Sequence, residues 1–333
     1  MEFMAKQVKR KSSSKKAKGK RGRNTARFVF LLVLIGLLLL AELVSFLVGK
    51  VGAAKEFPVQ AVLDFNGDNQ PCGSFGPWDV LAVPNGIVVS DQGHKRLLVF
   101  DTQGRFVREI GQKQAGKPDL TELSCLASDN SGNIYVMDTW SGLIRGFNPE
   151  GKAILQVDLT NKGFYGPRGV AWDGSNFLVA DTGSHRVVKV SPSGSVVWAK
   201  GKRGSGKGEF DNPTEVAVDD AGDSYTVDQD NHRIQCLDPK GNFLRAIGVG
   251  APPSAEAIDQ KHKLLFVSSL EGHFVKVFNL DGKLLGSMTE AGKKDGWVTD
   301  VRALSVMDNG NIVVYQSGKI VVYQPAPAAP SAN

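Results

Sequence analysis

From residue 76 to residue 324 the sequence repeats one plan, and this repeat limits the fold more than any other feature. In its full form the plan has a short apolar run, a turn, a second apolar run that ends in Asp, a polar turn with His and Arg, and two further runs separated by a Gly turn. Four short runs joined by turns predict a meander of four β-strands. Units of this length in series predict the blades of a β-propeller. The copies lie at 76–111, 123–159, 166–201, 212–248, 253–288 and 303–324.

The last copy stops after its third run, which would leave the edge of its blade unpaired. The segment "FPVQAVLDFNG" at 57–67 precedes the first copy and resembles the fourth runs "FVREIG" and "FLRAIG". We therefore expect residues 58–65 to complete the sixth blade and close the ring. The predicted fold is all-β, a six-bladed propeller of four-stranded antiparallel blades over residues 57–325.

One linker between copies carries a family resemblance. The segment "GSGKGEFDNP" at 204–213, followed by "EVAVDDAGDSYTVDQDNHRIQCLD", resembles the NHL repeat. The resemblance implies the six-bladed propeller of that family. It leaves function open, because related propellers serve as protein-binding platforms, RNA-binding domains, receptor sensor domains and metal-dependent enzymes.

The N-terminal part of the chain has a different character. Residues 1–27 hold eleven Lys or Arg and one Glu, whereas the rest of the chain has a net charge of −4. Such a tail is too polar and self-repelling to fold, and we expect it to be disordered. The next 22 residues, 28–49, are almost wholly apolar. As a helix they would reach about 33 Å, which matches a hydrocarbon core of about 30 Å. We expect a transmembrane signal anchor there, and a linker at 50–56.

The charge asymmetry predicts a single-pass topology with the basic tail in the cytoplasm and the propeller periplasmic or extracellular. A signal peptide cleaved before Ala54 is the alternative, but the apolar stretch and the basic region are both longer than is usual for one. The bacterial inner membrane is favoured, because the chain has no usable N-glycosylation acceptor and ends in a flexible Pro/Ala tail at 326–333. Anionic lipid is a plausible ligand for the basic tail, and nucleic acid is not expected to bind the acidic propeller.

The polar turn after the second run recurs from blade to blade. It pairs an Asp with an Arg across the hairpin in three copies: Asp91 with Arg96, Asp181 with Arg186, and Asp228 with Arg233. Exposed pairs of this kind stabilise a fold by about 0.2–1 kcal/mol. The histidines of these turns are distributed one to a blade, so we expect no metal site and no other cofactor. They are His94, His185, His232 and His273.

The three cysteines have structural interpretations. Disulfides are permitted beyond the membrane. Cys72 and Cys125 both lie near the starts of blades. The sequence leaves two alternatives for them: a disulfide between the two residues, or two free thiols. Cys236 shares a strand face with Ile234 and is expected to be buried.

Catalytic residues of a propeller would lie where the inner strands enter the central channel. Aligning the copies places Asp79, Cys125, Gly169, Glu215, Ala255 and Ala303 there. Only two of these are carboxylates, and they come from opposite sides of the ring. Exposed aromatic and Arg side chains are typical of protein-binding surfaces. Trp140 is such a residue, or else it covers a neighbouring blade. The candidate ligand-binding residues are Trp78, Asp79, Trp140, Arg168 and Glu215.

The sequence therefore predicts a membrane-anchored, extracytoplasmic propeller that acts as a protein- or ligand-binding scaffold. Its expected partners are other membrane or periplasmic proteins. The alternative is a divalent-metal-dependent hydrolase or lyase that uses Asp79 and Glu215 at the channel mouth. Binding is favoured over catalysis, because four of the six channel positions are small or uncharged.

Overall fold

The computed structural model describes residues 56–111, 120–291 and 296–326. The predictions for the basic tail, the membrane span, residues 50–55 of the linker and residues 327–333 lie outside these residues. Within them, no helix is long and apolar enough to cross a membrane.

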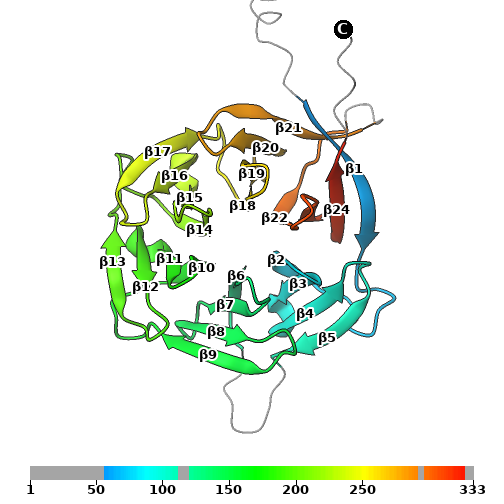
Figure 1. Ribbon diagram of the computed structural model, residues 1–333, viewed down its shortest axis with the longest axis horizontal. Helices are drawn as coiled ribbons and strands as arrows, with labels where there is room; N and C mark the ends of the chain where they lie inside the picture. Colours follow the sequence, from blue (N-terminus) through cyan, green and yellow to red (C-terminus); the bar gives the residue numbers. More distant parts are fainter. Residues whose placement is uncertain (1–55, 112–119, 292–295, 327–333) are drawn as a thin grey trace, which may run out of the picture. The chain divides into compact units, whose positions relative to one another are not determined.

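The described residues form 24 β-strands and three short 3-10 helices, arranged as six blades around a central axis (Figure 1). Blade 1 consists of β2 (Pro77–Val83), β3 (Gly86–Asp91), β4 (Arg96–Asp101) and β5 (Phe106–Ile110). Blade 2 consists of β6 (Leu123–Ser128), β7 (Ile134–Asp138), β8 (Leu143–Phe147) and β9 (Ala153–Asp158). Blade 3 consists of β10 (Pro167–Trp172), β11 (Phe177–Asp181), β12 (Arg186–Val190) and β13 (Val196–Lys200).

Blade 4 consists of β14 (Pro213–Val218), β15 (Ser224–Asp228), β16 (Arg233–Leu237) and β17 (Phe243–Gly248). Blade 5 consists of β18 (Ala255–Asp259), β19 (Leu264–Ser269), β20 (Phe274–Asn279) and β21 (Leu284–Glu290). Blade 6 consists of β22 (Val301–Val306), β23 (Ile312–Gln316), β24 (Lys319–Pro325) and, as its outer strand, β1 (Glu56–Phe65). The 3-10 helices are η1 (Gln92–His94), η2 (Thr182–Ser184) and η3 (Gln229–Asn231).

Strand β1 closes the ring in the place expected of residues 58–65. It pairs antiparallel with β24, with Asp64 opposite Val321. Its first four residues also run parallel to β21 of blade 5, which joins blades 5 and 6 into one eight-stranded sheet. Figure 1 shows β1 crossing from the outer edge of blade 5 to that of blade 6. The first strand of the domain thus bonds to its last, and no blade edge is left open at the seam.

The hydrophobic core lies between neighbouring blades. Strand β3, "GIVVSD", is buried along its whole length, which explains why its sequence is an almost continuous apolar run. Its Val88 packs with Val136 of the next blade. Full burial of a side chain of this kind stabilises the fold by about 1.5–3 kcal/mol. The periodic apolar runs of the sequence therefore build interfaces between blades.

The antiparallel order of the strands gives the ring two distinct faces. We call the end at which the inner strands begin the N-face. It carries the turns between second and third strands, such as residues 91–96, and the connections between blades, such as residues 200–213. The end at which the inner strands finish, which we call the C-face, carries the remaining turns.

The Asp at the end of the second strand is fully buried, in contrast to the exposed pair expected from the sequence. Asp228 accepts a hydrogen bond from Arg233 Nε at 2.6 Å and another from the backbone N–H of Asp211 at 2.7 Å. The same Asp–Arg contact spans 2.8 Å in blades 1 and 3. Removing one partner of a buried pair costs about 3–5 kcal/mol. This Asp therefore holds the turn to the segment that leads into the inner strand.

In three blades the histidine of this turn occupies a left-handed position. His185, His232 and His273 have φ angles of 53°, 54° and 49°. The corresponding residues are Lys95 in blade 1, with φ 56°, and Gly142 in blade 2, with φ 65°; His94 lies one residue before Lys95, within η1. Few residues other than Gly accept this conformation, and His is among those enriched in it. The repeated His is thus a feature of the turn.

Candidate binding site in the central channel

The first residues of the six inner strands form three rings down the axis. The pairing of β2 with β3 shifts register between Pro77 and Asp79, so Trp78 leaves the ladder at the channel mouth. The mouth ring consists of Trp78, Ser124, Arg168, Thr214, Ser254 and Arg302. The second ring consists of Asp79, Cys125, Gly169, Glu215, Ala255 and Ala303, as the aligned repeats predicted. The third ring consists of Val80, Leu126, Val170, Val216, Glu256 and Leu304.

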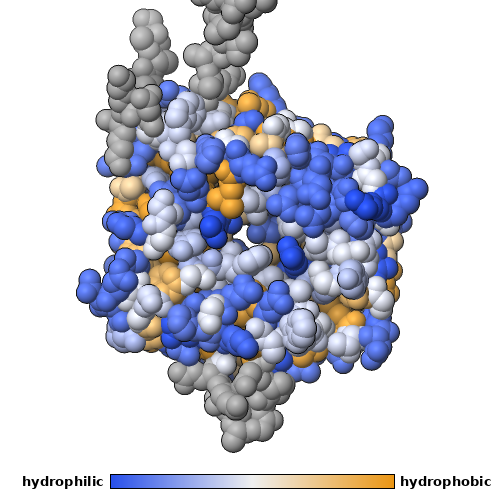
Figure 2. Space-filling view, turned by 180° about the vertical axis from the view of Figure 1, so that it is seen from behind, coloured by the Kyte–Doolittle hydropathy of each residue, from blue (hydrophilic) through white to orange (hydrophobic). Residues whose placement is uncertain are grey.

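A cavity of about 230 Å³ lies at the mouth ring and takes lining residues from all six blades. Trp78 is 47% exposed at its rim. Arg168 and Arg302 also line this cavity, from blades 3 and 6. Neither guanidinium has a hydrogen-bond or ion-pair partner among the described residues. The mouth therefore presents two unpaired cations and an indole to solvent. Figure 2 shows a narrow opening at the centre of the ring, bordered by hydrophilic residues.

Exposed aromatic side chains gather on the N-face. Trp140 is 79% exposed in the turn between β7 and β8, and Tyr165 is 73% exposed in the connection from β9 to β10. Trp297, which is 38% exposed, lies in the connection from β21 to β22. The other exposed large apolar residues are aliphatic and lie on outer strands, for example Val107 on β5. Trp140 therefore covers no neighbouring blade, and it borders a cavity of about 400 Å³.

Asp79 links two blades at the second ring. Its carboxylate accepts the N–H groups of Val80 and of Leu126, each at 2.7 Å, and Leu126 belongs to blade 2. Burial raises the pKa of Asp79 to about 7, although both amides oppose the rise. Asp79 thus stays largely neutral below neutral pH, with its oxygens engaged by the backbone.

Glu215 links blades 4 and 5 in the same way, because its Oε2 accepts the N–H of Glu256 at 3.0 Å. The Glu215 residue is partly exposed to the channel, and protein encloses the rest of its surface. Burial, and then the charge of Asp79, hold the pKa of Glu215 well above its ordinary range. The two carboxyl groups expected on opposite sides of the ring are therefore near enough to interact across the narrow channel.

Cys125 completes the polar part of the second ring. Its thiol donates to the carbonyl of Thr214 at 3.9 Å. Burial, followed by the charge of Glu215, raises the pKa of this thiol well above its usual value. A thiol that stays protonated is a poor nucleophile, so Cys125 is inert at neutral pH.

Glu256 was not identified from the sequence. It is 7% exposed, and neither of its carboxylate oxygens has a hydrogen-bond partner. Burial, and then the charge of Glu215, raise its pKa well above the ordinary range. Comparison of the repeats one position further along would have found it, because the other members of the third ring are Val or Leu.

These acids line a second cavity, of about 270 Å³, on the C-face side of the channel. Asp79, Glu215 and Glu256 contribute polar groups, and Asp308 lies at the C-face end. Within the described ranges, no group of three His, Cys, Asp or Glu side chains is arranged to hold a metal ion.

The three cysteines are free thiols, so the bridge considered between Cys72 and Cys125 is not formed. Cys72 packs in the hydrophobic cluster of blades 1 and 6, and its carbonyl accepts a hydrogen bond from Arg96 at 2.8 Å. Cys125 packs between blades 2 and 3, at the axis. Cys236 is fully buried beside Ile234, as expected.

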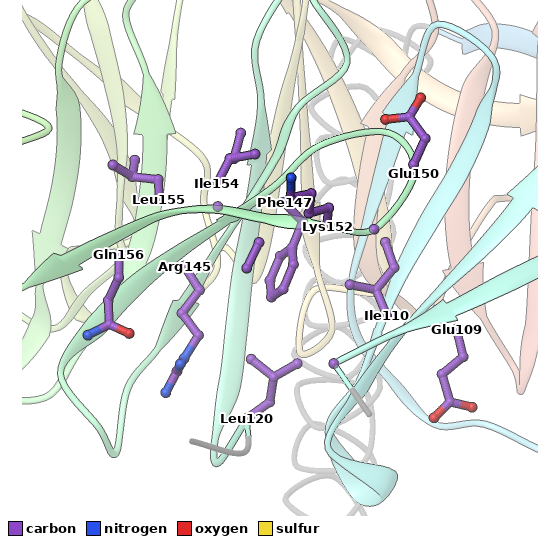
Figure 3. Close-up of a pocket in the computed structure, with 14 residues that line it drawn as sticks. Glu109, Ile110, Leu120, Arg145, Phe147, Glu150, Lys152, Ile154, Leu155 and Gln156 are labelled. Carbon is purple, nitrogen blue, oxygen red and sulfur yellow. The ribbon is translucent and has the colours of Figure 1, made fainter. Parts of the chain in front are cut away.

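A larger cavity, of about 670 Å³, lies between blades 1 and 2 (Figure 3). Leu120, Phe147 and Arg145 line it, and Arg145 Nε lies 3.6 Å from Asp138. The cavity also borders Gly111, and residues 112–119 between Gly111 and Leu120 lie outside the described structure. The axial channel is the more complete candidate site, because described residues of all six blades line it.

Comparison with known proteins agrees with this architecture. A family model described as a 6-bladed beta-propeller matches residues 76–181. NHL repeat-containing protein 3 of Mus musculus is 26% identical over 209 residues, which is 56% of this chain and 59% of the mouse protein. The human protein of that name is 24% identical over 49% of this chain and 52% of its own length. The chain is a six-bladed β-propeller that is similar to NHL repeat-containing proteins.

The propeller spans little more than half the length of the curated relatives it matches. Among solved structures, a streptogramin B lyase is similar with a TM-score of 0.57 and 12% identity, covering 75% of this chain and 94% of the lyase. A catalytically inactive virginiamycin B lyase from Staphylococcus aureus with quinupristin has a TM-score of 0.53 and 12% identity, covering 79% and 87%. At this identity the similarity shows the fold alone.

Proposed function

We propose that this propeller is a membrane-anchored, extracytoplasmic scaffold that binds an acidic segment of a partner protein at the mouth ring of its N-face. The observation that carries the proposal is the pair of unpartnered arginines, Arg168 and Arg302, beside the exposed indole of Trp78. Arg and Trp are the residue types that most often dominate the energy of protein interfaces.

The acidic character of the partner follows from the arginines. A guanidinium binds a carboxylate through two parallel hydrogen bonds. The arginines of the blade turns, such as Arg233, already bind a buried Asp of this chain. Arg168 and Arg302 have no such partner among the described residues, so each guanidinium is available to pair with a carboxylate of another molecule. Trp140 and Tyr165 extend the same surface outward.

Membrane attachment is part of the proposal. A span at 28–49 would hold the propeller at the bacterial inner membrane, with the basic tail in the cytoplasm and on anionic lipid. The partner would then be a membrane or periplasmic protein. A membrane-anchored binding surface benefits from the raised effective concentration of a partner in the same membrane.

The test is crosslinking of the full chain in intact membranes, with a photoreactive residue in place of Trp140. We expect the double variant Arg168→Ala/Arg302→Ala to reduce the captured partner at least about ten-fold, because interface hot spots typically contribute about 2 kcal/mol each. Capture should also weaken as salt is raised. The matched control is Lys240→Ala/Lys283→Ala on the C-face, which should capture normally. Equal capture by both double variants would count against the proposal.

The alternative of a metal-dependent hydrolase or lyase has less support. Its carboxyl groups would be Asp79 and Glu215, which accept hydrogen bonds from backbone amides of neighbouring blades. No metal-binding set of three groups occurs among the described residues. The lyases of similar fold are too distant in sequence to indicate their chemistry here.

A further inference from the structure

Glu256 is the member of the third ring that departs from the repeat. The other five positions hold Val80, Leu126, Val170, Val216 and Leu304. Glu256 is 7% exposed, and neither carboxylate oxygen has a hydrogen-bond partner. Burying a carboxyl without compensation is costly. The fold needs only an apolar side chain here, so the acid calls for another explanation.

The surroundings of Glu256 are acidic and contain no cation. Glu215 and Asp79 line the same cavity of about 270 Å³, and none of its lining residues is Lys, Arg or His. Asp79 and Glu215 each accept a hydrogen bond that joins two blades. Neither oxygen of Glu256 makes a hydrogen bond of normal geometry, although the backbone amide of Ala217 in blade 4 lies near enough to oppose the rise of the Glu256 pKa. The cavity therefore holds one carboxyl without a regular hydrogen bond, next to two whose hydrogen bonds join blades.

The two ends of the channel differ in charge. Arg168 and Arg302 lie at the N-face mouth. Asp308 is exposed at the C-face end of the acidic cavity. Charge that lines a cleft raises the local concentration of ligands of opposite sign. A cation would thus be repelled at the N-face and attracted at the C-face.

The lining of the cavity identifies the kind of cation. Its lining combines polar groups, which make up most of the exposed surface, with apolar side chains such as Trp172, Val218 and Ile258. An alkyl stem packs against these apolar side chains while its charged end meets the polar groups. A primary ammonium has three donors and a flexible stem, so it does not require the convergent ligand set that a metal needs and that these residues lack.

We infer that the C-face half of the channel binds a primary alkylammonium group, with Glu256 as its principal acceptor and Glu215 beside it. The group would belong to a free alkylamine or to a lysine side chain of another protein. Because an ammonium favours the ionised carboxylate, it lowers the pKa of Glu256, which burial and Glu215 hold above the ordinary range. Binding should therefore release protons.

The test is isothermal titration of the purified full chain near pH 8 with 1,5-diaminopentane and, separately, with Nα-acetyl-lysine amide. We expect saturable binding of at least one, with an enthalpy that varies with the ionisation heat of the buffer. The tighter ligand then shows whether a free amine or a protein lysine is the source. Glu256→Gln should weaken binding at least ten-fold. The matched control is Asp281→Asn, an exposed carboxylate of the C-face, which should bind as the parent does.

A second variant separates a binding role from a structural one. Glu256→Val restores the side chain of the repeat, so we expect it to abolish binding and to raise the melting temperature by roughly 4 °C. A lower melting temperature would show that Glu256 stabilises the fold and would overturn the inference. Failure of both amines to bind, or equal binding by Glu256→Gln, would also overturn it. The inference is independent of the N-face proposal, since Arg168→Ala/Arg302→Ala should retain amine binding.

Discussion

The mouth ring and the second ring are adjacent along every inner strand, yet they belong to different environments. Arg168 is exposed and unpaired, whereas the next residue, Gly169, is buried against blade 4. Trp78 faces solvent, whereas Asp79 is 8% exposed and bonded to blade 2. Moving one residue along the strand leads from a surface that a ligand can reach to an interface between two blades. Substitutions in the second ring should therefore change the stability of the fold, whereas substitutions in the mouth ring should leave it almost unchanged. Three predictions test this contrast.

The largest effect concerns pH and the second ring. The pKa of Asp79 is raised from 3.8 to about 7, so between these values the folded state holds a proton that the unfolded state has lost. Stability should fall as pH rises through this window, by about 3 kcal/mol between pH 5 and pH 7.5 from this group alone. Glu215 and Glu256 act in the same direction. Urea unfolding across this range measures the slope.

Asp79→Asn should flatten that slope, because an amide does not titrate. Glu150→Gln, an exposed change on the C-face, is the control and should leave the slope as it is. A parent protein that gains stability between pH 5 and pH 7.5 would contradict the burial of these acids.

An intermediate effect is expected at Gly169. A Cβ there would lie 2.8 Å from Glu215 Cα and 2.9 Å from the carbonyl oxygen of Thr214, and both are backbone atoms of blade 4. Gly169→Ala must push two inner strands apart, so we expect a loss of about 2 kcal/mol in the free energy of unfolding. Chemical denaturation measures it. A change within about 0.5 kcal/mol would show that the blades separate more easily than their packing implies.

The smallest effect on stability is expected at Arg168, one residue earlier. Its guanidinium contacts no partner among the described residues, so Arg168→Ala should change the free energy of unfolding by less than about 0.5 kcal/mol. The same denaturation experiment measures it beside Gly169→Ala. A large loss would mean that Arg168 supports the fold, and reduced partner capture by its variant could then not be assigned to binding.

The sequence repeat was sufficient to predict the fold in detail. The Asp that ends the second strand of blades 1 to 4, the Arg five residues later in blades 1, 3 and 4, and the closing strand before the first blade all follow from comparing the copies. The repeat also placed Asp79 and Glu215 in one ring. It did not indicate that their carboxyl groups bond to neighbouring blades, because that depends on the spacing between inner strands.

Two features of the candidate site depend on the tertiary structure. Arg302 is separated from Arg168 by more than a hundred residues, and only closure of the ring brings both to one cavity. Glu256 lies in an apolar run whose copies were aligned on the preceding residue, Ala255, so the alignment did not identify it. Its burial follows from the packing of blade 5 against blade 4, which no local pattern contains.

The sequence by itself determined the number of blades, the strand order and the turn chemistry, because each repeat carries the periodicity of its own strands and the residues of its own turns. Only the tertiary structure decided which polar side chains meet at the axis and which of them remain unpartnered. The physical reason is that the channel is built from one short stretch of each blade. Its charge and its hydrogen bonds are properties of the closed ring, and no single repeat contains them.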